Sequence, residues 1–262
     1  MQGALTIAGK ELWLLITTPV SYLLAAAYLL LSGFFFERLV VQFQGLVLQY
    51  RQRQQLAEQL NVTEFIMTPL FFWMVVFLML MLPLLTMRLF AEERRSQTLE
   101  LLLTSPVSLI DIVLGKYLGA LTLMLALIAS TLVFPLVLVS LGTSPSGAVL
   151  DLRTVASGYL GVVLIGSAVL SLGMFISTLT DSQLVAALSS MTLSILWVTV
   201  GVVSPSVHGL WRAVLSHVSF SEHIDHFARG LIQLDSIVYY GTVTGLGWFL
   251  SYRVLDLRRW RA

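Results

Sequence analysis

The strongest constraint on this chain is a series of apolar runs, each about as long as a bilayer is thick. A transmembrane helix needs roughly 20 consecutive, predominantly apolar residues. We identify six such runs, over residues 15–36, 69–90, 117–141, 155–179, 184–203 and 236–255. The runs are continuous and do not alternate every second residue, which favours helices over the strands of a membrane β-barrel. The sequence therefore predicts an all-α, polytopic integral membrane protein with six transmembrane helices.

The composition agrees with a membrane protein and excludes several functional classes. Hydrophobic residues make up 57% of the chain and charged residues only 11%, whereas soluble domains carry about 25% charged residues. A net charge of +1 gives no electrostatic reason for a nucleic-acid partner. The absence of cysteine excludes disulfides, thiolate metal sites and a thiol nucleophile.

The distribution of cationic residues predicts the orientation in the membrane. An even number of spans places both termini on one side, and cytoplasmic segments are enriched in Lys and Arg. With cytoplasmic termini, nine of the 15 Lys and Arg residues fall on the inner side: Lys10, Arg88, Arg94, Arg95, Lys116, Arg253, Arg258, Arg259 and Arg261. Trp260, among the last of these, is a typical interfacial anchor. We therefore expect cytoplasmic N- and C-termini.

Three segments outside the spans are predicted to be interfacial helices. Residues 1–14 form one at the inner surface. Residues 39–60 are rich in glutamine but keep an approximate helical spacing of apolar residues, which predicts a helix lying over the outer mouth. Between the last two spans, apolar residues recur in steps of four and three: Phe220, Ile224, Phe227, Leu231 and Leu234. That segment either rests in the outer interface or dips back toward the bundle.

Two features within the spans predict how the helices pack. The fourth span carries small residues four apart, which allow close helix approach: Ser157 with Gly161, Ser167 with Ser171, and Gly173 with Ser177. Pro83 in the second span and Pro135 in the third remove backbone donors and should kink those helices.

The densest charge in the chain lies between the second and third spans. Glu92, Glu93, Arg94 and Arg95 are consecutive, and no helix breaker occurs before Thr104. Leucines that lie along one side of the helix require a surface that buries them. Charges of both signs favour contact with a protein, because binding to anionic lipid would favour a purely basic segment. We therefore predict an amphipathic cytoplasmic helix over residues 92–104 that docks a partner protein, with Ser108 capping the next helix. The alternative is a solvated charged segment without a partner.

Two kinds of chemical site were tested against the sequence. A phosphate-binding loop requires G-x-x-x-x-G-K-[ST]. Neither glycine–lysine pair meets it, because Gly9-Lys10 has the wrong spacing and Gly115-Lys116 lacks both the first glycine and the hydroxyl residue. His223 and His226, three apart on a helix, are weak candidates for a metal site because no third ligand accompanies them. We therefore predict no metal site and no cofactor in this chain.

Several of these segments resemble a known family. The stretch from Arg88 to Ser108, RLFAEERRSQTLELLLTSPVS, followed by IVLGKY at residues 112–117, is similar to the signature of type-2 ABC-exporter permeases. The closest subgroup is the gliding-motility and nitrous-oxide-maturation permeases, which also resemble the chain over residues 222–230, at residues 238–240 and in the terminal Arg-Arg-Trp.

The resemblance implies a single transmembrane domain over residues 1–262 that pairs with a second permease, as a homodimer or a related heterodimer. Two cytoplasmic ATPase subunits, which bind ATP and Mg, would drive it. The helix between spans two and three is then the coupling helix, and the ATPase contact would comprise Glu92, Glu93, Arg94, Arg95, Thr98 and Glu100. Lys10 and Glu11 would form a second ATPase contact.

The resulting hypothesis is a non-catalytic permease subunit of an ATP-driven exporter. Two alternatives remain open from the sequence. One is a membrane anchor for an ATPase that performs mechanical or assembly work outside the membrane. The other is an ion-coupled secondary transporter, which the lack of midplane charges disfavours.

Overall fold

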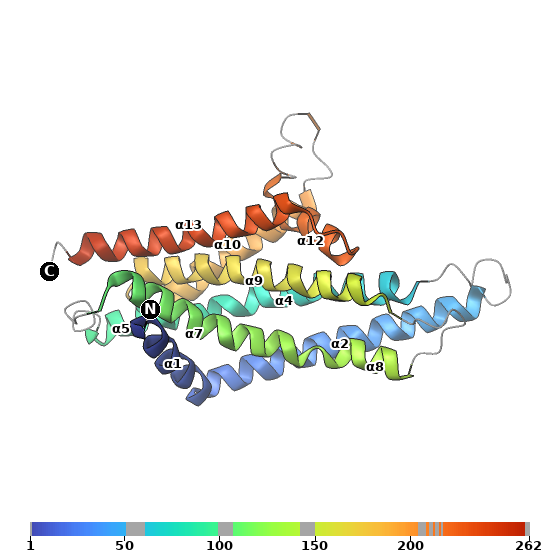
Figure 1. The fold of residues 1–262 in the computed structure, drawn as a ribbon, viewed down its shortest axis with the longest axis horizontal. Helices are drawn as coiled ribbons and strands as arrows, with labels where there is room; N and C mark the ends of the chain where they lie inside the picture. Colours follow the sequence, from blue (N-terminus) through green and yellow to red (C-terminus); the bar gives the residue numbers. More distant parts are fainter. Residues whose placement is uncertain are drawn as a thin grey trace.

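The computed structural model describes residues 2–50, 61–98, 107–141, 150–203, 208–209, 212, 215 and 217–259. Most of these residues are helical, and none of them forms a strand. The helices are α1 (Gln2–Thr17), α2 (Pro19–Tyr50), the short π-helix η1 (Thr63–Met67), α4 (Thr68–Thr86), α5 (Arg88–Arg95), α7 (Leu109–Ser130), α8 (Val133–Leu141), α9 (Leu152–Leu179), α10 (Gln183–Val203), α12 (Phe220–Ala228) and α13 (Leu234–Arg259). The long helices lie side by side in an elongated bundle (Figure 1).

Five helical segments of the described chain are long and apolar enough to cross a membrane. They cover Pro19–Gln49, Thr63–Arg95, Leu109–Ser140, Leu152–Leu179 and Gln183–Val203, and each overlaps one predicted span. The sixth predicted span, 236–255, falls in α13, which has 26 residues but is less apolar than the other five. The structure therefore supports five of the six spans by length and hydropathy, and the sixth stays a prediction.

The first span differs from its predicted limits. The predicted interfacial helix 1–14 corresponds to α1, which ends at Thr17, and α2 begins at Pro19 after a bend at Thr18. α2 then continues for 32 residues, about 48 Å at 1.5 Å per residue. The separate outer helix predicted over 39–60 is wrong as far as Tyr50, because that part extends α2. Residues 51–60 lie outside the described part.

The two prolines within spans have different effects. Pro135 lies in α8, and the helix is interrupted at Thr131 and Leu132. This position is expected, because a proline ring clashes with the carbonyl four residues earlier. Pro83 lies within α4, which stays helical through it and ends three residues later at Thr86. The chain resumes as α5 after Met87, so the predicted kinks appear as a break in one span and a helix junction in the other.

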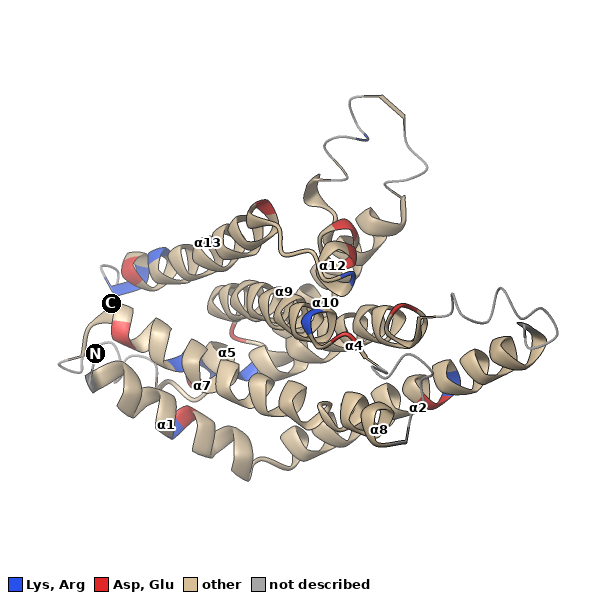
Figure 2. Cartoon of the chain, turned by 45° about the vertical axis from the view of Figure 1, so that its right-hand side comes forward, with Lys and Arg blue, Asp and Glu red and all other residues tan. Residues whose placement is uncertain are grey.

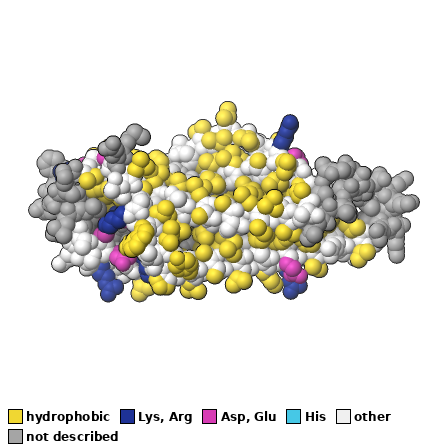
Figure 3. Space-filling view, turned by 60° about the horizontal axis from the view of Figure 1, so that its bottom comes forward, with side chains coloured by type: hydrophobic (Ala, Val, Ile, Leu, Met, Phe, Trp, Pro, Cys, Tyr) yellow, Lys and Arg dark blue, Asp and Glu magenta, His cyan; other side chains and the backbone are white. Residues whose placement is uncertain are grey.

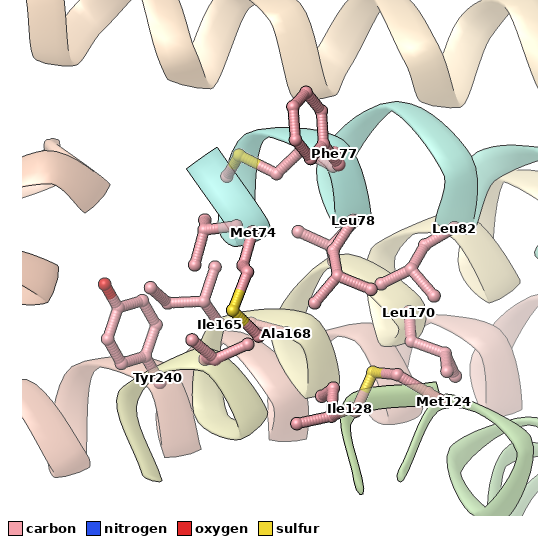
Figure 4. Packing of buried hydrophobic residues seen from close by; sticks show 14 of the residues in the cluster. Met74, Phe77, Leu78, Leu82, Met124, Ile128, Ile165, Ala168, Leu170 and Tyr240 are labelled. Atoms are coloured by element: carbon pink, nitrogen blue, oxygen red, sulfur yellow. The ribbon is translucent and has the colours of Figure 1, made fainter. Parts of the chain in front are cut away.

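α9 is the central helix of the bundle. It packs against α4, α7, α10, α12 and α13. Figure 4 shows Met74, Leu78 and Leu82 of α4 meeting Ile165, Ala168 and Leu170 of α9 and Met124 and Ile128 of α7. The predicted close approaches along this helix are confirmed, because a Cβ at Gly161 would lie 2.7 Å from Cβ of Phe227 and a Cβ at Gly247 would lie 2.6 Å from Oγ of Ser171.

α12 packs into the bundle, which decides between the two alternatives for the stripe over 220–234. Phe220, Ile224 and Phe227 are buried against α4 and α9. Thr68 of α4 donates a hydrogen bond to the Ala228 carbonyl at 3.1 Å, and Ser157 of α9 donates one to the Phe227 carbonyl. Leu231 and Leu234 are exposed, because α12 ends at Ala228 and the chain turns at Gly230, whose φ is +83°.

Apolar side chains cover much of the outer surface, as expected of a protein surrounded by lipid or by another subunit. Leu30, Leu136 and Leu188 are each at least 65% exposed. In Figure 3 hydrophobic side chains gather along the middle of one face, and charged side chains lie toward its ends. Both termini lie at the same end of the bundle, as Figures 1 and 2 show.

Candidate functional site

The end of the bundle that holds both termini also contains the most extensive buried ion pairing among the described residues. Lys116 of α7 is 1% exposed and forms ion pairs with Glu11 of α1 and Glu93 of α5. The Nζ–Oε1 distance to Glu93 is 2.8 Å. The lysine also lies 5.2 Å from the centre of the Phe90 ring. We call Glu11, Glu93 and Lys116 the buried triad.

The local sequence explains how this lysine becomes buried. α7 begins at Leu109, eight residues before the predicted start of the span at 117, so Lys116 lies two turns inside the helix. Ser108 caps α7, as predicted, by accepting a hydrogen bond from the Asp111 amide at 3.1 Å. The sequence analysis counts Lys116 only among the cationic residues of the inner side, just before the span predicted from residue 117, and does not predict its burial. The signal available in the sequence was that mostly apolar residues flank Lys116 on both sides, which favours burial.

Two glycines of α7 allow α1 to lie directly against it. A Cβ at Gly115 would lie 2.7 Å from the Ala4 carbonyl oxygen, and a Cβ at Gly119 would lie 2.8 Å from Cβ of Glu11. Such distances are possible only without a side chain. The two glycines, on one face of α7, therefore bring the Glu11 carboxylate over Lys116 and bury it, leaving Glu11 4% exposed.

Arg94 of α5 contacts the end of α9. It donates to the Thr178 carbonyl at 3.3 Å and forms an ion pair with Asp181, just beyond the end of α9. Burial, together with the nearby Arg94 guanidinium, lowers the pKa of Arg258 on α13, and Asp181 acts in the opposite direction. Three charged side chains from α5, the α9–α10 connection and α13 therefore lie near one another.

The predicted coupling helix over 92–104 is not one continuous helix. α5 begins earlier, at Arg88, and ends at Arg95. Gln97 has a φ of +57°, in the left-handed region that a non-glycine residue rarely adopts. The hydroxyl of Ser96 bonds the Glu92 carbonyl at 2.9 Å and the Thr98 hydroxyl at 2.9 Å. These bonds stabilise the turn that ends α5. Glu100 and the leucine stripe lie outside the described residues.

The residues predicted for the ATPase contact therefore fall into two groups. Glu11, Glu93 and Arg94 are largely buried and paired within this chain. The other described candidates have exposed side chains: Lys10, Glu92, Arg95 and Thr98. We call Glu92, Arg95 and Thr98 the exposed surface of α5 and its turn.

His223 is buried and already has hydrogen-bond partners at both ring nitrogens. Nδ1 lies 2.8 Å from the Ser236 hydroxyl and Nε2 lies 3.2 Å from the His217 carbonyl oxygen. The ring stacks on Tyr239, and burial lowers its pKa. Among the described residues no three His, Cys, Asp or Glu side chains gather closely enough to hold a metal ion. His223 and His226 therefore have no neighbouring third ligand in the described structure.

The apolar surface, the long helices and the charged end together define a multi-pass helical membrane protein. Comparison with protein families assigns it further. A family model described as ABC-2 family transporter protein matches residues 5–244. Because this match covers most of the chain, from α1 into α13, the chain belongs to that family of membrane transport components. A comparison with curated proteins finds no match.

Proposed function

We propose that this chain is the permease subunit of an ATP-driven exporter, in which the end holding the buried triad faces the cytoplasm and docks separate ATPase subunits. The family supports a transporter subunit. The buried triad is the observation that supports the docking role. In a largely apolar bundle it attaches α5 to α1 and α7, while the other face of α5 stays exposed. The resemblance favours the gliding-motility and nitrous-oxide-maturation subgroup and a bacterial inner membrane.

Side-chain exposure supports a narrower choice of the residues that we propose touch the ATPase. Glu92, Arg95 and Thr98 are exposed, and with Glu100 they form the proposed contact. Lys10 is the exposed member of the proposed second contact. Glu11, Glu93 and Arg94 act differently in this proposal, because their partners within the chain hold α5 in place. A surface with charges of both signs suits a specific protein partner.

The proposed mechanism transmits movement through the buried ion pairs. ATP and Mg bind to the ATPase subunits, and closure of the ATPase pair displaces α5. Because Lys116 joins α5 to α1 and α7, the three helices move together. Such a rigid-body shift changes access at the interface with a second permease, provided that nucleotide favours one of two packed states.

Reversing the exposed charge at Arg95 tests the docking surface. Arg95→Glu should reduce co-purification of the ATPase and its stimulation by about tenfold or more, because a mismatched charge at a contact costs at least 1.4 kcal/mol. The chain should still insert and fold, since Arg95 is exposed. Arg153→Glu, an exposed arginine at the start of α9, is the matched control. Unchanged ATPase binding and stimulation in Arg95→Glu would exclude this docking surface.

Accessibility labelling tests the proposed orientation. The chain contains no cysteine, so single cysteines can be introduced without a background signal. A cysteine at Ser96 should react with an impermeant thiol reagent only from the cytoplasmic side, and a cysteine at Gln52 only from outside. The opposite pattern would invert the topology and remove the cytoplasmic docking proposal.

Transport in reconstituted vesicles separates this proposal from its two alternatives. An exporter moves a solute only when ATP and the ATPase subunits are present. A membrane anchor supports ATP hydrolysis without solute movement, and a secondary transporter moves solute with an ion gradient alone.

A further inference from the structure

The junction between α4 and α5 is held by a serine from another helix. The Ser177 hydroxyl of α9 accepts hydrogen bonds from the backbone amides of Phe90 and Ala91, both at 3.1 Å. It lies 3.1 Å from the Met87 carbonyl oxygen, to which it donates. A serine hydroxyl has one hydrogen and two lone pairs. The α4–α5 junction therefore uses the full hydrogen-bonding capacity of Ser177.

These bonds replace a cap that α5 lacks. Amides in the first turn of a helix have no carbonyl partner within it, and a polar side chain just before the helix usually supplies one. Met87 occupies that position and offers no side-chain cap. The Phe90 amide, the third of α5, has no such carbonyl, and Phe90 is buried, so water does not replace the missing partner. Ser177, 87 residues away from Phe90 in sequence, supplies it, and it also accepts a bond from the next amide, that of Ala91.

The neighbouring residues show that α9 holds α5 at several points. Gly173, one turn before Ser177, lies so close to Thr86 that a Cβ there would overlap its side chain. Thr178 and Asp181, just after Ser177, both bind Arg94. The start of α5 and its last turn are thus attached to one end of α9, the helix that packs against most of the bundle.

We infer that Ser177 is a positioning residue that couples α5 to the central helix α9. The inference rests on the proposed function, because it assigns Ser177 to the transmission of movement from an ATPase bound at α5. The buried triad attaches α5 to α1 and α7, and Ser177 attaches it to α9. Without Ser177, displacement of α5 would be taken up by local opening of the α4–α5 junction and would reach α9 incompletely.

Ser177→Ala in the complete permease–ATPase complex tests this role. Hydrogen exchange of the Phe90 and Ala91 amides should rise at least about tenfold, because local opening controls exchange. Stimulation of the ATPase should fall several-fold at saturating ATP, with an unchanged KM for ATP and unchanged co-purification. A general loss of folding would instead raise exchange throughout the chain and reduce co-purification.

Ser171→Ala is the matched control. Ser171 is also on α9 and fully buried, but its hydroxyl bonds the Ala168 carbonyl of its own helix. It should leave both the exchange of the two amides and ATPase stimulation unchanged. Unchanged amide exchange in Ser177→Ala would overturn the inferred cap, and faster exchange with full stimulation would overturn the coupling role. If no ATPase co-purifies even with the unaltered chain, the proposed function fails, and the exchange measurement still reports on the cap.

Discussion

Lys116→Met is expected to destabilise the protein by about 3–5 kcal/mol, because removing one partner of a buried ion pair leaves the other charge uncompensated. Here one lysine faces two carboxylates, Glu11 and Glu93, and the first of them is almost completely buried. Methionine fills similar space without a charge. The free energy of unfolding, measured by denaturant titration in mixed micelles, reports the loss.

Two further variants identify the cause. Lys10→Met removes an exposed lysine from α1 and should change stability by no more than about 0.5 kcal/mol. The triple variant Glu11→Leu, Glu93→Leu and Lys116→Met removes all three charges together, and replacing buried ion pairs by apolar residues is often neutral or stabilising. It should recover most of the stability. A Lys116→Met protein as stable as the unaltered chain would show that the triad is not a buried charge cluster.

The triple variant also separates stability from coupling. Apolar side chains pack without the directional contact that ion pairs provide, so α5 would no longer be fixed to α1 and α7 in one geometry. We therefore expect a stable triple variant with reduced ATPase stimulation. Full stimulation would mean that the triad contributes to folding alone.

The sequence predicted the spans well because their signal is local. A run of apolar residues reports burial in lipid or protein at each position, and the five spans supported by the structure overlap the predicted runs. α13 shows the limit of this reasoning. It contains Gly, Ser, Thr and Tyr residues that reduce its hydropathy, and its packing against α9 cannot be deduced from composition.

The candidate site was predicted less completely, for a different physical reason. The charge density between the second and third spans made α5 the candidate segment, but the exposure of each side chain depends on residues distant in sequence. Glu93 and Arg94 are adjacent, yet one turns to Lys116 and the other to Asp181. No local pattern distinguishes them from the exposed Arg95. Gln97, just after the end of α5, has a left-handed backbone conformation. Glutamine rarely adopts this conformation, so the residue type gave no signal for it.

The second large effect is expected from Gly158→Ala in α9. A Cβ at this position would overlap the Phe71 ring of α4. That ring is fully buried and packs edge-on against Tyr159, with centroids 5.2 Å apart, so it has little space to move. Overpacking a close-packed interior costs about 1–3 kcal/mol and occasionally more. The same micelle titration should show a loss of this size, with α4 and α9 forced apart.

Gly241→Ala provides the matched control, because nothing lies within 4 Å of a Cβ at this position in α13. Alanine is the better helix former by about 0.5–1 kcal/mol, so the control should be neutral or slightly stabilised. Combining Gly158→Ala with Phe71→Leu makes room for the added methyl group, and the two changes should then cost less together than the sum of their separate effects, by about 0.5–3 kcal/mol. Strictly additive effects would mean that the glycine does not control the α4–α9 contact. Small residues bring helices together where lipid is as apolar as the protein interior, so loss of this contact should also weaken the proposed transmission of movement from α5 through α9.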